Sequence, residues 1–258
     1  METTIAKIEN LEKRSAAKEV KLPGWPDNKR GTPNSFLRSA LFSAVQSKDR
    51  ADLKGAVMAS QGGITIKYTG EQLNQEDLTL WETMVHLCKE SPLGNICQFT
   101  AYEILKALQL GTRADDYERL HIGIVRLIAC AVEIEQGRKK YIGSLLIDAA
   151  LESEPEIRYR VQLNRSLIRL YVENTWVDFG QRLQLRSKPL AQFLHGYYSS
   201  HKTPYPVTVA FLHGLSGSKT KALWKFKQSL SAALDELVKI DFLKSYLIED
   251  DLVRVEKA

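Results

Sequence analysis

The order of patterns near the C-terminus restricts the fold more than any other feature of the sequence. Val207–Gly214 is short and apolar and predicts a brief helix, which the glycine-containing turn Gly214–Ser218 ends. Lys219–Ile240 repeats apolar residues every three or four positions and predicts a long amphipathic helix. Leu243–Ile248 and Leu252–Glu256 follow as alternating segments and predict a β-hairpin. Few small folds contain helix, tight turn, helix and hairpin in this order.

The same order of patterns occurs in the middle of the chain. Helices are predicted for Phe99–Leu110 and Ala114–Leu127, with a turn of a few residues between them. The alternating segments Ile128–Glu135 and Tyr141–Ile147 come next, and the basic segment Gln136–Lys140 predicts the tip of their hairpin. Helix, turn, helix and hairpin is the order of a winged helix, so the sequence predicts this unit twice.

The predicted fold class is therefore α+β and helix-rich, with two tandem winged-helix domains at residues 33–153 and 154–258. Residues 158–163 alternate and predict a strand in the second domain. Residues 1–32 are predicted to be an N-terminal helical leader and linker, because residues 4–20 have a helical composition and Leu22–Pro33 holds three prolines and two glycines. A chain of 258 residues is long enough for two domains.

Composition favours a cytoplasmic protein that does not contact a membrane. Hydrophobic residues make up 44% and charged residues 26% of the chain, which is ordinary for a globular protein. No apolar segment approaches the roughly 20 residues that cross a bilayer, and the N-terminus lacks the pattern of a secretory signal. Cys88, Cys97 and Cys130 are scattered and odd in number, so we expect no disulfide framework.

Charge is distributed unevenly along the chain. Residues 1–150 hold 20 basic and 19 acidic side chains, whereas residues 158–227 hold 12 basic and two acidic ones. An excess of ten positive charges in one segment favours a surface that faces phosphates. The alternative is a solvated basic face that acidic neighbours balance.

The strongest candidate site is the start of the predicted helix at Lys219. Its first turns carry four lysines and no acid before Asp235, and a helix N-terminus adds unpaired N–H groups and a partial positive charge. In a helix-turn-helix, this part of the second helix meets base edges in the major groove, where Gln228 can pair with adenine. Trp224 belongs either to the core or to the groove contact. The predicted DNA-contact residues are Lys219, Thr220, Lys221, Trp224, Lys225, Lys227 and Gln228.

The first unit carries a weaker version of this site. Arg113, Arg119 and Arg126 belong to its second helix, but Asp115, Asp116 and Glu118 on the same helix cancel their charge. This helix is therefore predicted to contact either DNA or another protein, for example in a dimer. The predicted hairpin tip adds Arg138, Lys139 and Lys140, which either contact the DNA backbone or only increase solubility.

Enzyme motifs are missing or incomplete. Gly214–Thr220 resembles a phosphate loop, but its last glycine is not adjacent to the lysine and no strand of buried type precedes it. The five histidines are dispersed, and the sequence contains neither Cys-x-x-Cys nor His-Glu-x-x-His. No Gly-x-Ser-x-Gly nucleophile motif occurs. We therefore predict no enzymatic activity, no cofactor and no metal site.

Longer segments resemble the TrfA family of plasmid replication initiators, from about residue 22 to the C-terminus. The segments that carry this resemblance are Leu22–Pro26, Pro33–Phe42, Gln61–Gly70, Asp77–Glu82, Leu194–Tyr198 and Phe226–Leu237.

The resemblance implies tandem winged helices that bind directly repeated sequences, called iterons, in double-stranded DNA at a plasmid origin. It further implies opening of an adjacent A·T-rich duplex and recruitment of the host replicative helicase together with the host initiator. Members of the family commonly form dimers off DNA and bind the origin as monomers. Some also contact the sliding clamp through a motif of the Gln-Leu-x-Leu-Phe type, to which Gln181–Leu185 is a poor approximation.

Two other classes of protein are weighed against this one. A winged-helix transcriptional regulator bound to an operator shares the groove contact, and genetic context separates it from an initiator. A DNA-processing enzyme requires a nucleophilic tyrosine beside a metal cluster, and the sequence offers no such grouping of histidines or carboxylates.

Overall fold

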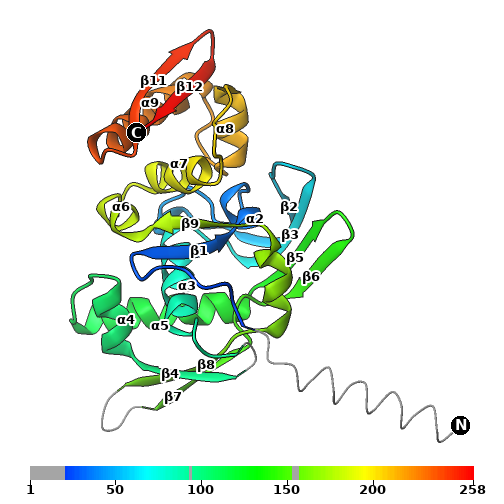
Figure 1. The fold of residues 1–258 in the computed structure, drawn as a ribbon, viewed down its shortest axis with the longest axis vertical. Coiled ribbons are helices and arrows are strands. Elements are labelled where there is room, and N and C mark those ends of the chain that lie inside the picture. The colour runs from blue at the N-terminus through cyan, green and yellow to red at the C-terminus, as the bar shows by residue number, and fades with distance from the viewer. Residues whose placement is uncertain (1–20, 93–94, 153–156) are drawn as a thin grey trace, which may run out of the picture.

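The computed structural model describes residues 21–92, 95–152 and 157–258 (Figure 1). The helix predicted for residues 4–20 lies outside these ranges. Two hydrophobic clusters organise the described chain, one formed by residues between Leu22 and Phe179 and the other by residues between Leu185 and Val253. We call residues 21–178 the first unit and residues 185–258 the second unit. The helix α6 (Phe179–Gln184) connects them.

The first unit contains three antiparallel sheets. The largest has the order β2-β3-β5-β6, and its hairpin β5–β6 is the one predicted after the second helix. The smaller sheets have the orders β4-β8-β7 and β1-β9. The strands are β1 (Lys29–Pro33), β2 (Asp52–Met58), β3 (Ile64–Glu71), β4 (Ile96–Thr100), β5 (Ala131–Gln136), β6 (Lys139–Gly143), β7 (Asp148–Glu152), β8 (Arg158–Gln162) and β9 (Asn174–Asp178).

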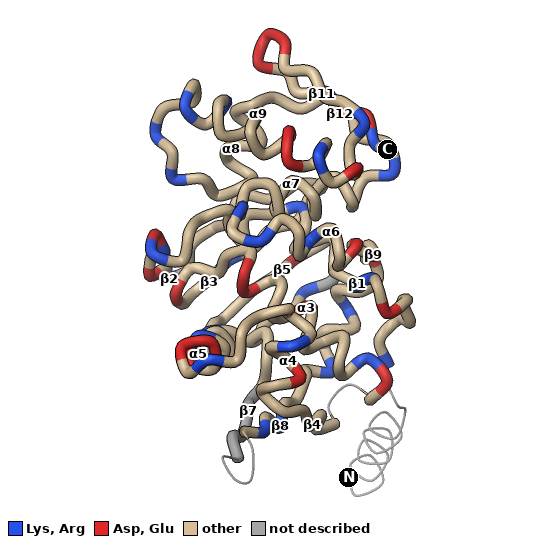
Figure 2. The backbone as a smooth tube through the Cα atoms, turned by 90° about the vertical axis from the view of Figure 1, so that its left-hand side faces the viewer, with Lys and Arg blue, Asp and Glu red and all other residues tan. Residues whose placement is uncertain are grey.

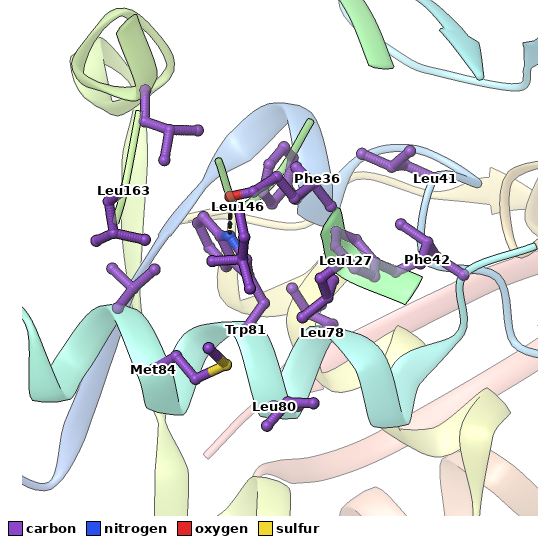
Figure 3. Packing of buried hydrophobic residues seen from close by; sticks show 14 of the residues in the cluster. Phe36, Leu41, Phe42, Leu78, Leu80, Trp81, Met84, Leu127, Leu146 and Leu163 are labelled. Carbon is purple, nitrogen blue, oxygen red and sulfur yellow. Dashed lines mark hydrogen bonds between the residues drawn. The ribbon is translucent and has the colours of Figure 1, made fainter. Parts of the chain in front are cut away.

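Helices of the first unit pack around α3, which the core side chains of Figure 3 surround. Asn74 caps α3 by accepting hydrogen bonds from the backbone N–H groups of Glu76 and Asp77, which fixes where the helix begins. The ring of Trp81 on this helix is fully buried, with its centroid 4.9 Å from that of Phe36. The helices are α2 (Asn34–Leu37), α3 (Gln75–Leu87), α4 (Ala101–Ala107), α5 (Ala114–Ala129) and two 3₁₀ segments, η1 (Ser47–Asp49) and η2 (Arg165–Val172).

The second unit is a compact winged helix with a three-stranded sheet of order β10-β12-β11. Leu230, Leu234 and Leu237 form the buried stripe of its long helix and join the second core. The elements are α7 (Pro189–Ser199), β10 (Val207–Thr208), α8 (Val209–Leu215), α9 (Leu223–Lys239), β11 (Leu243–Glu249) and β12 (Leu252–Lys257).

Two expectations about the chain's organisation differ from the structure. The segment expected to be a linker is part of the first unit, because Leu22 and Trp25 are buried and β1 pairs with β9 across about 145 residues of sequence. The strand at 158–162 was expected in the second domain, yet it pairs with β4 and β7. The two cores therefore meet at α6 rather than at residue 153.

A buried ion pair fixes α6 against the first unit. Arg182 on α6 is fully buried, and its Nε atom lies 3.0 Å from Oε2 of Glu82 on α3. Arg182 also donates hydrogen bonds to Thr79 and to the backbone and side-chain oxygens of Gln75, and Thr32 donates to Glu82. Burial raises the pKa of Glu82 and lowers that of Arg182. The charge of Arg182 partly offsets the rise at Glu82, and the charge of Glu82 partly offsets the fall at Arg182.

The second unit is held on the other side of the same helix. The Gln181 side chain donates a hydrogen bond to the carbonyl oxygen of Ile240 and contacts the buried ring of His195. Gln192 of α7 donates a hydrogen bond to the carbonyl oxygen of Arg182. The connecting helix α6 therefore makes polar contacts with both units.

In the described ranges, no helix has the length and apolar character that crossing a bilayer requires.

Removing one partner of the buried pair should destabilise the protein strongly. Either Glu82→Ala or Arg182→Ala leaves an uncompensated buried charge and should lower the free energy of unfolding by about 3–5 kcal/mol. The double substitution Glu82→Leu/Arg182→Met should cost less than either single change. Urea denaturation followed by tryptophan fluorescence measures these differences. Lys244→Met, in an exposed pair with Glu256, is the control and should change stability little. A Glu82→Ala variant as stable as this control would contradict the burial of the pair.

Candidate nucleic-acid interface

The long helix of the second unit begins four residues later than the sequence predicts. Ala222 is its N-cap, and the Lys225 and Phe226 N–H groups donate the first hydrogen bonds to the Ala222 carbonyl oxygen. The preceding Thr220 carbonyl oxygen accepts a hydrogen bond from His213 Nε2 at 2.8 Å instead. The prediction that Lys219 starts the helix is therefore wrong, and Lys219, Thr220 and Lys221 belong to the loop between α8 and α9.

The start of α9 presents a polar face to solvent. Trp224 is 61% exposed, and Lys225 and Gln228 are exposed beside it. Phe226, on the opposite face, is only 1% exposed and packs against the ring of His213. Of the two positions predicted for Trp224, the structure therefore excludes the core.

The lysines of this segment differ in their partners. Lys221 and Lys225 form no ion pair with another described residue, and the Lys225 Nζ atom lies 5.4 Å from the centroid of the Trp224 ring. Lys227, in contrast, lies 2.8 Å from a carboxylate oxygen of Asp251. The Nζ atom of Lys219 donates a hydrogen bond to the backbone carbonyl oxygen of Asp49 in the first unit. Lys221 and Lys225 are therefore the cations best placed to accept an external anion.

Sequence reasoning missed two exposed residues on the same helix face. Ser229 follows Lys225 by four positions and Ala232 follows Gln228 by four, so both continue the stripe that begins at the N-terminus. Both side chains are small, which allows another molecule to approach the helix backbone closely. The helical period was the signal that could have identified them.

The hairpin that follows α9 has an acidic tip. Glu249, Asp250 and Asp251 form it, and the last two have positive φ angles of 48° and 59°. Figure 2 shows this tip projecting away from the body of the molecule, with basic positions near the start of α9. Arg254 and Lys227 offset two of the carboxylates, at 3.7 Å and 2.8 Å. The tip repels phosphates, so the basic surface is limited to α9 and the loop before it.

The excess of ten positive charges does not form one surface, which corrects the sequence-based interpretation. Arg182 is buried against Glu82, and Lys188 lies 2.5 Å from Glu236. Arg186 donates hydrogen bonds to the carbonyl oxygens of Leu108 and Gln109 at the end of α4. Arg158, Arg160 and Arg165 also have partners. Several cations of this segment therefore hold the fold together instead of facing solvent.

The second helix of the first unit, α5, combines exposed charge with exposed apolar side chains. Arg113 and Arg119 are exposed at its start, and Arg119 has no ion pair or hydrogen bond with another described residue. Ile122 and Val125 are each 46% exposed on the same helix. This mixture leaves both predictions open for α5, a contact with DNA or a contact with protein.

At the hairpin tip of the first unit, an acidic side chain offsets part of the positive charge. Arg138 is exposed, whereas Lys140 lies 3.3 Å from a carboxylate oxygen of Glu133. Lys139 begins β6, and its side chain lies outside the described part of the structure. A contact of this tip with DNA stays a prediction.

Close packing fixes the turn before α9 on the first unit. The Ala44 N–H group donates a hydrogen bond of 2.7 Å to the carbonyl oxygen of Ser216. Gly217 has a φ of +63°, and a Cβ atom there would lie 2.6 Å from the Ser43 hydroxyl oxygen. Only glycine permits this approach, so the first unit determines how the start of α9 is oriented.

The described residues contain no group of three or more side chains suited to holding a metal ion. The three cysteines are free and buried. The exposed groups near α9 can bind an anion and stack on a planar ring, and they offer no nucleophile with an adjacent base.

The chain is similar to known proteins in sequence and in fold. The chain matches the model of the family described as TrfA protein over residues 7–257. The plasmid replication initiator protein TrfA of Escherichia coli is 26% identical to it over 243 residues, which cover 90% of this chain and 63% of the relative. The chain therefore spans less than two thirds of the length of that relative.

Two solved structures share the fold. Domains 2 and 3 of RctB superpose with a TM-score of 0.60 at 13% identity, covering 88% of this chain and 98% of that chain. The Pi initiator protein, solved in complex with iteron DNA, gives a TM-score of 0.52 at 11% identity, covering 71% and 94%. These matches confirm the predicted α+β fold with tandem winged helices.

Two aromatic residues on opposite faces of α9 should respond differently to truncation. Phe226→Ala should lower the free energy of unfolding by about 3–5 kcal/mol, because it leaves a cavity in the second core. Trp224→Ala should leave stability nearly unchanged, since most of its ring is in water. Thermal unfolding followed by circular dichroism measures both. A large loss for Trp224→Ala would mean that this ring is packed in the core.

Proposed function

Because the chain belongs to the TrfA protein family, we propose that it is a plasmid replication initiator that binds iteron repeats in the double-stranded DNA of an origin. In this proposal α9 lies in the major groove, which admits an α-helix and distinguishes all four base pairs. The loop before α9 then faces the phosphates at the edge of the groove. The proposal assigns no chemical reaction to the chain.

The observation that carries the proposal is the start of α9, where exposed cations have no carboxylate partner in the described chain. Lys221 and Lys225 can neutralise phosphates or donate to guanine, and Gln228 can form two hydrogen bonds with adenine. The exposed ring of Trp224 can contact the methyl group of thymine. The crystallised complex of the Pi initiator with iteron DNA, a protein of the same fold, supports the choice of iterons.

The first unit contributes less to base recognition in this proposal. Asp115 and Glu118 on α5 offset the charge of Arg113 and Arg119, so in this proposal these two arginines add only weak contacts to the DNA backbone and read no bases. Arg138, Lys139 and Lys140 add backbone contacts at the hairpin tip. The apolar Ile122 and Val125 on α5 support a second role, contact with another copy of the chain off DNA.

Later steps of initiation belong to the same proposal. We infer from family membership that the bound protein opens the adjacent duplex and recruits the host replicative helicase and the host initiator. The family also supports a dimer off DNA and a monomer on DNA. The relative from Escherichia coli is described as a plasmid replication initiator protein, which supports the general class of function. We do not extend the proposal to the sliding clamp, because Gln181–Leu185 lies in the connecting helix, where Arg182 and Leu185 are buried.

Footprinting on the protein's own plasmid tests the proposal directly. Purified protein should protect several short direct repeats at the origin, each with the same polarity. Protection of a single palindrome that overlaps a promoter would instead identify an operator-binding regulator. Nicking of supercoiled origin DNA in the presence of Mg²⁺ would contradict the assignment to a DNA-binding protein without enzymatic activity.

Removing the two unpaired lysines should weaken DNA binding. Lys221→Ala/Lys225→Ala should reduce iteron affinity by about tenfold or more and reduce the slope of log affinity against log salt by about 2. Fluorescence anisotropy over a range of salt concentrations measures both quantities. Unchanged affinity in this variant would remove α9 as the reading helix.

A second double variant controls for net charge. Lys188→Ala/Lys244→Ala also removes two positive charges, but from ion pairs outside the proposed interface, so iteron affinity should change little. Lys227→Ala should have a smaller effect than either Lys221→Ala or Lys225→Ala, because Asp251 already offsets its charge. Equal losses in all these variants would indicate a general electrostatic effect instead of a defined surface.

A further inference from the structure

A cavity of about 250 Å³ lies between the two units. Leu80 of α3, Leu108 at the end of α4 and Leu120 of α5 line it from the first unit. Leu183 of α6 and Gln192 of α7 line it from the joint and the second unit. The cavity therefore has a mainly apolar wall to which both units contribute, and its location at a seam between units is typical of small-molecule sites.

The mouth of the cavity exposes apolar side chains to water. Leu110 is 38% exposed and Ile122 is 46% exposed, and both line the cavity. Contact with water at such residues is unfavourable, and an apolar ligand seated beside them would reduce it. The helices α3 and α5 are closely packed beneath the cavity, because a Cβ atom at Gly123 would lie 2.8 Å from the Leu80 side chain.

Most of the charged groups around the cavity already have partners. Arg126 lies 2.7 Å from Asp77, and Arg50 lies 2.6 Å from the other oxygen of the same carboxylate. Arg186 donates to the carbonyl oxygens of Leu108 and Gln109. These groups hold the wall together, and only the Nε atoms of Arg50 and Arg126 are buried there without a hydrogen-bond partner among the described residues.

The remaining charged groups leave one cation without a partner. The Asp116 carboxylate accepts a hydrogen bond from the Arg113 N–H group, and Glu76 accepts one from the Ser47 hydroxyl. Arg119 lines the cavity, is exposed, and has no hydrogen bond or ion pair with another described residue. Its guanidinium can therefore bind a carboxylate through two parallel hydrogen bonds.

We propose that this cavity binds a small amphipathic anion, with its apolar chain between Leu80, Leu108 and Leu120 and its carboxylate on Arg119. The volume is slightly below the usual range for ligand sites, about 300–1,000 Å³, so the ligand is short. A straight-chain carboxylate of about eight carbons has the right combination of size, apolar surface and charge. The site does not involve α9, but it shares Arg119 and Ile122 with the contacts proposed above for α5. Its ligand therefore binds the chain when α5 contacts neither DNA nor a second copy.

Titration of the full chain with octanoate tests this site. Isothermal calorimetry should give a single site with a Kd of about 0.1–1 mM, and 1-octanol should bind more weakly because it lacks the charge. Arg119→Gln should weaken octanoate binding about fivefold or more and leave octanol binding unchanged. Lys106→Gln, which removes an exposed cation of α4 outside the cavity, is the matched control and should bind octanoate normally.

A second pair of variants tests the location. Ile122→Trp places a large ring at the mouth and should abolish octanoate binding. Val125→Trp, at a position equally exposed on the same helix but outside this cavity, should retain it. Circular dichroism should show that both variants are folded.

Three results would overturn the proposal. The first is the absence of octanoate binding to the unaltered chain up to about 10 mM. The second is equal octanoate affinity in Arg119→Gln and in the unaltered chain, which excludes the anion contact. The third is octanoate binding that survives Ile122→Trp, which places the ligand elsewhere. All three are independent of DNA binding, so a failure here and a failure of the proposed function are distinguishable.

Discussion

The fully buried ion pair between Arg182 and Glu82 is the interaction on which the relative placement of the two cores depends. Removing two charges from water is costly, and their attraction compensates for it only when further hydrogen bonds satisfy both groups. Thr32, Thr79 and Gln75 supply most of those hydrogen bonds, and Arg182 Nη1 is left without one among the described residues. The pair therefore specifies one position for α6 on α3. Since α6 also contacts α7 and the end of α9, the same pair constrains where the second unit lies.

Patterns of short range predicted most elements correctly. The stripe of α9 and the hairpin after it follow from spacings within a few residues. The pairing of β1 with β9 could not be predicted in this way, because the prolines and glycines of Leu22–Pro33 give the same local signal in a linker and in an edge strand. The start of α9 was also mispredicted, since a tertiary contact from His213 takes the Thr220 carbonyl oxygen.

The candidate site illustrates the same limit in electrostatic terms. Counting charges along the sequence drew attention to Lys221, in the loop before α9, and to Lys225, in its first turn, and both lack carboxylate partners in the described chain. It could not separate these lysines from Lys227 or from Arg182, because a partner distant in sequence neutralises each of the latter. Burial and pairing are properties of the folded chain, so they decide which members of a basic segment can meet a phosphate.

Under the proposed function, the tight packing of Gly217 against Ser43 has a consequence for the DNA that the chain would recognise. If this packing fixes α9 relative to the first unit, the distance and angle between the DNA contacts of the two units are also fixed. Inserting one base pair within a repeat rotates the far side of the duplex by roughly 35°, since B-DNA completes a turn in about 10–10.5 base pairs. The length of each repeat would then be as strictly specified as its bases.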